Sequence, residues 1–353
     1  MKLEEMKNRL GCWLDGSGPN PEMVLSTRVR LARNVAGHRF THRADPSELE
    51  GLVSEVVGAV HETGALGPSL TLRIDSTPDL ERRFLMERHL LSTELVEAER
   101  PAAVILGEDE CLSIMVNEED HLRIQAIQSG FQPAATWDLA SRIETNLEKR
   151  LMFAFSDELG YLTACPTNTG TGLRVSVLVH LPGLVLTGQI SRAFRGIGQL
   201  GLTVRGLYGE GTDAMGNFFQ VSNQTTLGQS ESDILESLER VTRRVIENEG
   251  MSRRFLLKEA KPQIEDKVWR AFGLLKHGRL MRPAEVLNLC SAVRLGVGIG
   301  MVSGVPIHLL NSLMVLSQPA HVERILGRAL DESESPIARA DLVRRLLKDC
   351  NVS

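Results

Sequence analysis

Two apolar segments, at residues 112–117 and 122–127, are separated by only the four residues from Glu118 to His121. Each segment has the length and the aliphatic composition of a β-strand, and so short a connection joins strands that run antiparallel. The sequence therefore predicts a β-hairpin whose turn carries three consecutive acids. Because acidic side chains are rarely buried, this turn is either a solvated loop or part of a functional site.

Alternating apolar and polar residues predict the rest of a sheet. Residues 23–33 alternate in this manner and place Arg28 and Arg30 on the same side of one strand. Further strand candidates are residues 70–75, 102–107, 173–181, 202–208 and 218–223. Apolar residues recur at helical spacing over 136–153 and again from 230, where Gly250 predicts the end of the second helix. These patterns predict an α+β first domain, residues 1–258, in which helices flank an antiparallel sheet.

The sequence changes character after this first domain. Residues 261–266, KPQIED, are interpreted as a linker. Four short helix candidates follow, separated by glycine and proline. They cover residues 283–298, 306–317, 319–330 and 335–347. We therefore expect a small all-helical second domain over residues 262–353.

Charge and cysteine usage exclude several classes of protein. A formal net charge of −5 argues against a general nucleic-acid-binding protein, which needs clustered positive charge. The charged N-terminus predicts no signal peptide, and no apolar segment reaches membrane-spanning length. The cysteines are scattered without the C-x-x-C spacing of a zinc site, so we expect no zinc site, no disulfide framework and a cytoplasmic location. They are Cys12, Cys111, Cys165, Cys290 and Cys350.

Common nucleotide-binding and hydrolase motifs do not fit this chain. It has no Gly-Lys pair and hence no P-loop, and neither H-E-x-x-H nor G-x-S-x-G occurs. Residues 196–201, GIGQLG, match G-x-G-x-x-G but lead into a strand candidate instead of following one, which favours a turn between elements. Residues 296–304 are glycine-rich but fall in the helical region. A phosphate-binding site would therefore have to be built from other residues.

Arginines recur on the strand candidates. In addition to Arg28 and Arg30, the residues Arg123, Arg174 and Arg205 each lie on or beside a predicted strand. Guanidinium groups that converge on one face of a sheet repel one another unless a polyanion lies between them, and their planar donors match phosphate oxygens in pairs. Such a cluster favours a nucleoside triphosphate with Mg²⁺, because phosphoryl transfer needs mainly positioning and charge stabilisation. Taken singly, each arginine fits a surface salt bridge instead.

Four segments resemble the successive signature blocks of the phosphagen (guanidino) kinases. They are STRVRLARN (26–34), VNEEDHLRI (116–124), CPTNTGTGLR (165–174) and RGLYGEGTDAMGNFFQVSNQTTLGQSE (205–231), in the order of that family. Within the family, the chain is similar to the bacterial protein-arginine-kinase branch, including ERHLLS (87–92), YGEG (208–211) and the appended helical region. The resemblance implies a phosphagen-kinase-like catalytic domain followed by a helical domain for self-association and regulation.

The same resemblance assigns roles to the acids. It implies that Glu119 holds the acceptor guanidinium and acts as the base, while Glu118 and Asp120 tune or brace the site. A guanidinium group has a pKa above about 12 and cannot attack phosphorus while it is fully protonated, so a carboxylate must align it and accept its proton. Glu210 matches a second acid that helps to fix the substrate guanidinium. Cys165 occupies the family's reactive-cysteine position, where we expect a structural or tuning role.

The resemblance further implies a site for ATP, with Mg²⁺ carried by the nucleotide and no separate metal site on the protein. The arginines are expected on the phosphates, and His89 is expected near the nucleotide. The residues that match the family's ATP-binding segments are Ser26, Thr27, Arg28, Val29, Arg30, His89, Arg123, Arg174, Val175, Ser176, Val177, Leu178, Arg205, Gly206, Leu207, Tyr208, Gly209 and Glu210.

The acceptor is expected to be arginine within a protein. Kinases of free creatine or arginine carry a large helical N-terminal domain, whereas here only 25 residues precede STRVR. An open acceptor side suits an arginine presented on a protein surface. The alternatives are a kinase of a small guanidino compound and a catalytically silent adaptor that binds nucleotide or phosphoarginine. The presence of Glu119, Glu210 and the arginines argues against the adaptor.

The context implied by the resemblance is stress response and protein quality control. The expected partners are proteins with exposed arginines, a zinc-finger activator, a heat-shock repressor, a Clp ATPase–protease and a second copy of the chain, with no nucleic acid or membrane bound directly. Many protein arginine kinases carry an R-D-x-x-R-A motif that forms a phosphoarginine pocket. Here residues 335–340 read SPIARA, so Ser335 and Pro336 replace the Arg and the Asp. Arg339 and Ala340 remain, and a neighbouring arginine, such as Arg328 or Arg344, could supply the lost contact. Without such compensation, the departure predicts little or no stimulation by phosphoarginine.

Overall fold

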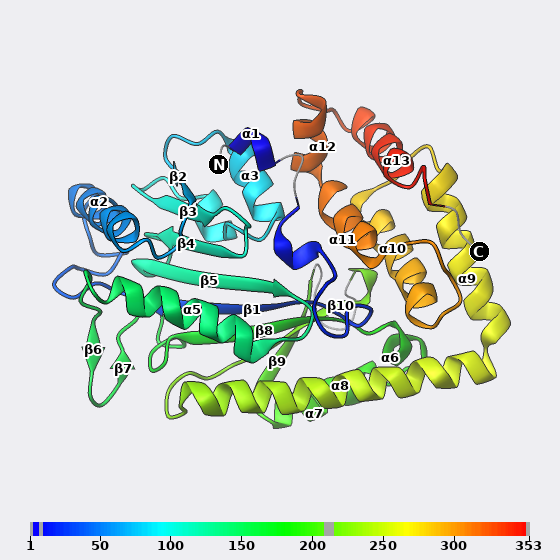
Figure 1. Cartoon of the computed structure of the whole chain (residues 1–353), viewed down its shortest axis with the longest axis horizontal. Helices are drawn as coiled ribbons and strands as arrows, with labels where there is room; N and C mark the ends of the chain where they lie inside the picture. The colour runs from blue at the N-terminus through cyan, green and yellow to red at the C-terminus, as the bar shows by residue number, and fades with distance from the viewer. Residues whose placement is uncertain (1–2, 7–9, 208–214, 351–353) are drawn as a thin grey trace.

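The computed structural model describes residues 3–6, 10–207 and 215–350. Within them, the centre of the fold is an eight-stranded antiparallel sheet with the order β2-β3-β4-β5-β1-β8-β10-β9 (Figure 1). Its strands are β1 (Val24–Arg33), β2 (Ser69–Arg73), β3 (Ala103–Gly107), β4 (Leu112–Val116), β5 (Leu122–Ser129), β8 (Leu173–His180), β9 (Leu202–Gly206) and β10 (Phe218–Asn223). A separate small hairpin consists of β6 (Phe155–Ser156) and β7 (Gly160–Tyr161). The antiparallel sheet confirms the expected fold class.

Helices cover the sheet and continue beyond it. They are α1 (Leu3–Met6), α2 (Pro46–Thr63), α3 (Asp79–Glu87), α4 (Thr93–Val96), α5 (Pro133–Leu147), α6 (Pro182–Leu186), α7 (Ile190–Gln199), α8 (Glu231–Glu259), α9 (Lys261–His277), α10 (Pro283–Gly298), α11 (Ile307–Leu316), α12 (Pro319–Leu326) and α13 (Glu334–Leu346), with 3₁₀ turns η1 (Cys12–Leu14) and η2 (Met215–Asn217). Local signals set their ends: Asp45 caps α2, Gly64 ends it in the left-handed conformation, and Ser230 with Asp233 forms a capping box at α8. In the described ranges, no helix is both long enough and apolar enough to cross a membrane.

The two faces of the sheet differ in chemistry. Alternate residues of β1, such as Val29, belong to a buried apolar cluster that α2, α5 and α8 cover. The intervening residues Arg28 and Arg30 therefore point to the other face. The register sets Arg30 opposite Arg174 of β8 and brings Arg123 of β5 to the same side. We call this side of the sheet the arginine face.

Strands β4 and β5 form the predicted hairpin. They pair antiparallel, with Val116 opposite Leu122 at the tip. Asn117 begins the turn in the left-handed conformation, with φ 57°, and its amide donates to the carbonyl of His121 at 2.9 Å. The three acids therefore lie at the end of a fully paired hairpin, as predicted from the sequence.

Two predicted boundaries around residue 258 were wrong. Helix α8 continues through Gly250 to Glu259, because contacts with α6 stabilise this part of the helix. The buried Glu249 pairs with Arg253 at 2.7 Å and accepts from the backbone of α6 at Gly183 at 2.9 Å. One glycine costs a helix only about 1 kcal/mol, which such contacts offset. The expected linker at 261–266 is instead the start of α9, and the helical path breaks only at Ala260.

Two smaller differences concern α5 and α7. The helix expected over 136–153 begins at Pro133 and ends at Leu147. Proline suits the first position of a helix, because the backbone N–H that it lacks would have no partner within the helix there. The GIGQLG motif covers the end of α7 and the turn into β9, where Gly201 has φ 76°. The motif therefore leads into a strand, as expected, but its first four residues are helical.

Helices α9 to α13 form the helical C-terminal region. All four helices predicted there are present as α10 to α13. Apolar side chains of α9, α10, α11 and α13, among them Val268, Val293 and Leu310, form a cluster separate from that of the sheet, whereas Ala320 of α12 packs in the cluster of α3. Figure 1 shows α8 leading along the base of the sheet into this region. Asn311 of α11 also donates to the carbonyl of Leu14 at 3.0 Å, so the region contacts the N-terminal segment.

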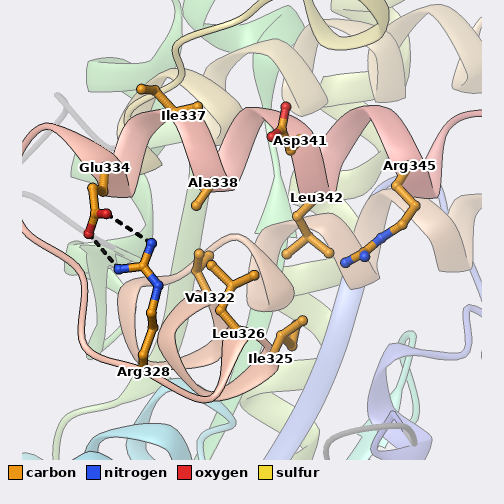
Figure 2. A pocket seen from close by; sticks show the side chains of 10 residues that line it. All are labelled: Val322, Ile325, Leu326, Arg328, Glu334, Ile337, Ala338, Asp341, Leu342 and Arg345. Carbon is orange, nitrogen blue, oxygen red and sulfur yellow. Dashed lines mark hydrogen bonds and ion pairs between the residues drawn. The ribbon is translucent and has the colours of Figure 1, made fainter.

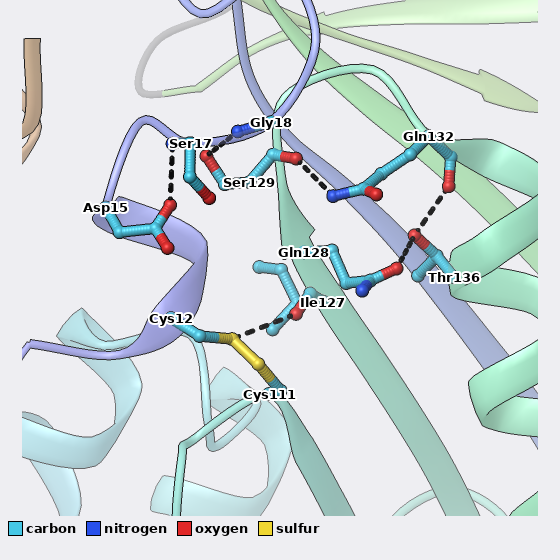
Figure 3. The surroundings of a disulfide bond; sticks show 10 residues. All are labelled: Cys12, Asp15, Ser17, Gly18, Cys111, Ile127, Gln128, Ser129, Gln132 and Thr136. Atoms are coloured by element: carbon cyan, nitrogen blue, oxygen red, sulfur yellow. Dashed lines mark hydrogen bonds between the residues drawn. A yellow bond between two sulfur atoms is a disulfide. The ribbon is translucent and has the colours of Figure 1, made fainter.

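Cys12 and Cys111 form a disulfide bond, which corrects the expectation of no disulfide (Figure 3). Their Cα atoms are 5.8 Å apart although 99 residues separate them in the chain. The N-terminal segment carries Cys12 to this position, where its amide donates to the carbonyl of Asp109 at 3.1 Å. Further along the segment, Gly18 lies so close to Ser129 that a Cβ at Gly18 would be 1.9 Å from its carbonyl oxygen. Only glycine fits there.

Breaking this bond should lower stability. In the chain-entropy model, a crosslink that closes a loop of about 100 residues stabilises a protein by up to about 4.7 kcal/mol. We therefore expect oxidised Cys12→Ser protein to unfold at a lower urea concentration than oxidised wild type. In excess reductant the two proteins should have nearly equal midpoints, which serves as the control. Equal midpoints without reductant would contradict the assignment.

Candidate active site

The acids of the hairpin turn have different environments. Glu118 is buried, and its carboxylate forms an ion pair with Arg123. Burial raises the pKa of Glu118, but Arg123, the amide of Glu119 and the hydroxyl of Ser92 lower it by more, so the pKa lies below its usual value. Glu118 is therefore ionised near neutral pH and fixes Arg123 in place.

Asp120 is also buried, and it holds the turn to its neighbours. One carboxylate oxygen, Oδ1, accepts from Nδ2 of Asn34 at 2.7 Å and from the amide of Ala164 at 2.6 Å. The first bond joins the turn to the end of β1, and the second joins it to the segment that leads to Cys165. Asp120 thus fixes three parts of the chain relative to one another.

Glu119, between these two acids, is exposed. Its Oε2 lies 3.5 Å from Nδ2 of Asn168, and it borders a cavity of about 220 Å³. The cavity is lined by Arg30, Ala32, Glu118, Glu119, Asp120, Arg123, Cys165, Thr167, Asn168, Gly172 and Arg174. Of the three acids in the turn, Glu119 is the one whose carboxylate is available to a ligand.

The arginines of the arginine face perturb one another. Burial, followed by the charges of Arg123 and Arg174, lowers the pKa of Arg28 to about 10. Burial and the neighbouring arginines lower the pKa of Arg30 well below its ordinary value, and burial, Arg205 and Arg123 lower that of Arg174. In the part of the chain that the structure describes, Arg123 alone of these five forms an ion pair with a carboxylate. The face therefore carries a large uncompensated positive charge.

Donor atoms on this face lack partners. Within the described residues, the buried Nε atoms of Arg30 and Arg174 have no hydrogen-bond partner. A triphosphate would supply both oxygen acceptors and negative charge, so this donor set fits the phosphates of ATP. Nowhere in the described ranges do three or more His, Cys, Asp or Glu side chains gather where they could hold a metal ion.

His89 lies near the same arginines. Burial and the charges of Arg28 and Arg30 lower the pKa of His89 to about 3, so its imidazole is neutral. The residue adopts the left-handed conformation, with φ 59°, and its carbonyl accepts from Nε2 of Gln125 at 2.8 Å. The ring of Trp13 lies 5.2 Å from the imidazole, measured between ring centroids. The structure thus brings His89 to the arginine face.

The other residues of the expected nucleotide segments divide by face. Val29, Val175 and Val177 belong to the apolar cluster on the opposite side of the sheet, so their side chains are unavailable to a ligand on the arginine face. Thr27 is also buried, and its hydroxyl donates to the carbonyl of Gly130 at 2.7 Å. These residues fix the strands and do not contribute side chains to the site.

The remaining residues of these segments lie further from the cavity or outside the description. Ser26, Ser176 and Leu178 alternate onto the arginine face but are buried there. Gly206 ends β9, and Leu207 packs against the apolar cluster that contains Trp13. The expected second acid, Glu210, lies outside the described residues together with Tyr208 and Gly209.

Some contributors to the site were not singled out in the sequence. Asn168, which contacts Glu119, belongs to the CPTNTGTGLR segment. The match of this segment to the family was the sequence signal that could have indicated Asn168 as a site residue. In the same segment, the sulfur of Cys165 lies 3.0 Å from the hydroxyl oxygen of Thr167. Gln220 accepts from Arg28 at 2.8 Å, and only the alternation of β10 could have indicated it.

Solved structures with a similar fold include two kinases. One is the duplicated taurocyamine kinase from Schistosoma mansoni, solved with transition state analogue components, with a TM-score of 0.60 and 27% identity. The match covers 66% of this chain and 34% of that one, so the chain spans about a third of its length. Lombricine kinase has a TM-score of 0.58 and 23% identity, with 69% and 70% of the two chains covered, and supports the fold alone.

Sequence comparisons cover nearly the whole chain. Residues 50–252 match the ATP:guanido phosphotransferase, C-terminal catalytic domain, and residues 261–353 match the protein-arginine kinase McsB C-terminal domain. Protein-arginine kinases from Pelotomaculum thermopropionicum and Symbiobacterium thermophilum are 46% and 48% identical. The first match covers 97% of both chains, and the second covers 95% of this chain and 96% of the relative. The chain therefore belongs to the protein-arginine kinases of the ATP:guanido phosphotransferase family.

Proposed function

We propose that this protein transfers the γ-phosphoryl group of ATP to arginine side chains of other proteins. The observation that carries the proposal is the contrast within one site. An arginine face with almost no compensating acid borders a cavity whose exposed acid is Glu119. The arginines suit the phosphates of a nucleotide, and the exposed carboxylate suits a guanidinium group. The two opposite charges provide neighbouring sites for the two reactants.

The acids of the turn have different roles in activating the acceptor. Glu119 aligns a nitrogen of the acceptor guanidinium and takes up its proton as the new bond forms. Glu118 keeps Arg123 in place, and Asp120 holds the turn, so Glu119 extends from a fixed backbone. We assign Glu210 as a second acid on the acceptor side, from its match to the family.

The arginines stabilise the negative charge of the transferred group. ATP, with its Mg²⁺, supplies the phosphoryl group when it is bound. Arg28, Arg30, Arg123, Arg174 and Arg205 come from neighbouring strands whose register is fixed by the sheet, so their charges are in place before the reaction begins. This geometry supports direct transfer without a nucleophile from the protein, which leaves Cys165 a structural or tuning role.

Protein arginine is favoured over a small guanidino compound as the acceptor. The relatives named protein-arginine kinase match over nearly the full length, including the helical C-terminal region. The solved taurocyamine and lombricine kinases match over 66% and 69% of this chain. The exposed Glu119 also argues against a silent adaptor, because a carboxylate beside the arginine face repels the phosphates of a nucleotide and is useful only where an acceptor guanidinium also binds.

The decisive experiment is an incubation with Mg-ATP and an unfolded, arginine-containing protein. We expect incorporated phosphate that is released by acid but is stable to alkali, as a phosphorus–nitrogen bond on arginine should be. Parallel reactions with free arginine and taurocyamine test the alternative acceptor. Turnover of a small compound without labelling of protein would contradict the proposal, and an absence of both reactions would favour the silent adaptor.

Several further features are proposed on the family match. We propose that residues 1–258 act as the catalytic domain and residues 262–353 as a domain for self-association and regulation, with a homodimer as the working form. The separate apolar cluster that α9, α10, α11 and α13 form with Leu256 at the end of α8 supports this division. The proposed setting is stress response and protein quality control in the cytoplasm. The proposed partners are a zinc-finger activator, a heat-shock repressor and a Clp ATPase–protease.

The SPIARA segment supports a departure in regulation. Arg339, the arginine retained from the family motif, is buried, and each of its three side-chain nitrogens already donates to a protein oxygen. Its Nε donates to the carbonyl of Ser317 at 2.6 Å, and its Nη1 donates to that of Met281 at 3.1 Å. Its Nη2 donates to the hydroxyl of Ser335 at 3.1 Å. Arg339 therefore supports the packing of α13 and is not free to bind a phosphoryl group.

Two neighbouring arginines, Arg328 and Arg344, already have acidic partners. A groove of about 530 Å³ lies between α12 and α13, as Figure 2 shows. At its edge Arg328 forms two bonds with Glu334, at 2.6 and 2.9 Å. Arg344, near the end of α13, is paired with Asp341, which lies three residues before it on the same helix. Both cations are thus already neutralised by acids of this region.

Free phosphoarginine should therefore stimulate this enzyme little or not at all. The reason is that Arg339, Arg328 and Arg344 already have partners that a bound phosphoryl group would have to displace. Arg345 also lines the groove and forms no described ion pair, but a single guanidinium replaces only part of the lost motif. The measurement is the initial rate of protein phosphorylation across a phosphoarginine titration, with free phosphate as the control ligand. A saturable, several-fold rise in rate would show that a phosphoarginine pocket survives in another form.

A further inference from the structure

A buried charged cluster joins the C-terminal region to the end of α3. Glu87, the last residue of α3, accepts from the amides of Ala320 and His321 in α12 at 2.9 and 3.0 Å. Its Oε2 also lies 2.7 Å from Nδ1 of His321. The next residue, Arg88, is buried and forms two 2.7 Å bonds with Glu110. The end of α3 is thus held between α12 and the turn that joins β3 to β4.

The contacts of His321 require a neutral ring with a defined tautomer. A carboxylate only accepts hydrogen bonds, so Nδ1 carries the proton and donates to Glu87. A guanidinium only donates, and Nη1 of Arg88 lies 3.5 Å from Nε2 of His321, so Nε2 accepts. Burial lowers the pKa of His321. Glu87 raises it and the charges of Arg88 and Arg324 lower it further, and the net lowering agrees with a neutral ring. One side chain thus bridges an acid and a base with one donor and one acceptor.

Glu87 and Arg88 directly precede His89. The left-handed conformation of His89 is unfavourable for a residue other than glycine. It therefore persists only where contacts fix the chain both before and after this residue. After His89, the amide of Leu90 donates to the carbonyl of Leu85 at 3.0 Å, and the side chain of Gln125 donates a hydrogen bond to the carbonyl of His89 itself. Before His89, the contacts of Glu87 with α12 and of Arg88 with the β3–β4 turn fix the chain.

We propose that His321 is a positioning residue for the nucleotide site. By bridging Glu87 and Arg88, it keeps the end of α3 in the conformation that turns His89 onto the arginine face. The C-terminal region thereby sets the affinity for ATP, although none of the residues that line the cavity beside Glu119 comes from α9 to α13. The inference rests on the proposed ATP site but not on the identity of the acceptor.

The test compares three variants in the full-length protein. His321→Leu removes both bonds, whereas His321→Gln keeps an amide donor and a carbonyl acceptor. Arg324→Gln is the matched control, because Arg324 joins the same two helices through a separate ion pair, with Glu81 at 2.7 Å. The readouts are the dissociation constant of a fluorescent ATP analogue, the KM for ATP and the KM for the protein substrate.

We expect His321→Leu to weaken nucleotide binding by about tenfold, which is the change that results when the full contribution of one hydrogen bond to a charged group is transmitted to the site. The KM for ATP should rise in parallel while the KM for the protein substrate stays unchanged. His321→Gln should bind within about threefold of wild type, since both bonds can re-form. Arg324→Gln should lower the melting temperature but leave nucleotide affinity unchanged.

Two outcomes would overturn the inference. One is unchanged nucleotide affinity in His321→Leu, and the other is an equal loss of affinity in Arg324→Gln, which would indicate only a loosened interface. If His321→Leu does not fold, Glu87→Gln removes the charge-assisted bond with less change in packing and should weaken binding in the same direction. Because nucleotide binding is measured directly, the result stands apart from whether wild type phosphorylates protein arginine.

Discussion

Replacing Glu119 by glutamine is expected to slow phosphoryl transfer by at least about a hundredfold, in the range attributed to a general base. Glutamine keeps the size and polarity of the side chain, but it cannot accept the guanidinium proton and does not attract the cation. Nucleotide affinity should change little, because Glu119 forms no described ion pair with the arginine face. The effect should therefore fall on kcat and on the KM for protein, with the KM for ATP unchanged.

Initial rates of phosphoarginine formation at saturating ATP provide the measurement, with binding of a fluorescent ATP analogue in parallel. Glu158→Gln is a suitable control, because Glu158 is an exposed acid in the turn between β6 and β7 and does not line the cavity. It should retain wild-type activity. If Glu119→Gln phosphorylates protein within a few-fold of wild type, the assignment of the base is wrong.

Removing a cation from the arginine face should be nearly as damaging. Arg174→Ala deletes a guanidinium from the cavity lining, and Arg205→Ala deletes its neighbour on β9. Loss of one preorganised donor to a developing charge commonly costs about a hundredfold or more in rate. We therefore expect each variant to lose at least that much of its kcat/KM, although neither residue is placed on the acceptor.

The unusual charge of this face gives the experiment a second readout. Burial is the main cause of the lowered pKa of Arg28 and Arg30, and the charge of Arg174 lowers both further, so its removal should relieve repulsion and leave the fold as stable as before or more so. Thermal unfolding of Arg174→Ala should show no loss of melting temperature. Arg192→Ala, at an exposed position on α7, is the matched control and should leave activity unaltered. Normal turnover of both Arg174→Ala and Arg205→Ala at saturating ATP would contradict the phosphate-binding role.

Features that depend on local pattern were predictable from the sequence. The hairpin at residues 112–127 follows from two apolar segments and a short connection, and the structure confirms it. The placement of Arg28 and Arg30 on one face follows from strand alternation alone. Their convergence with Arg123 and Arg174 depends on the strand order, which contacts between distant residues determine. The family resemblance indicated the convergence only by placing these arginines on the phosphates of ATP.

Features that depend on distant partners could not be predicted in this way. The three acids of the turn look alike in the sequence, and only the positions of Arg123 and Asn34 show that Glu118 and Asp120 are the buried ones. The Cys12–Cys111 bond joins segments 99 residues apart. Gly250 suggested a helix end, and the contacts of Glu249 with α6, which the sequence does not reveal, carry the helix past it.

The pairing of β1 with both β5 and β8 also limits how related proteins can differ in length. An insertion of one residue within β1 would move every following side chain of the strand to the opposite side. Arg30 would then enter the apolar cluster, and Val29 or Leu31 would take its place beside the nucleotide. We therefore expect insertions and deletions among relatives to be absent from β1, β5 and β8. They should gather instead in connections such as residues 64–68, where Gly64 and Gly67 have open space around them.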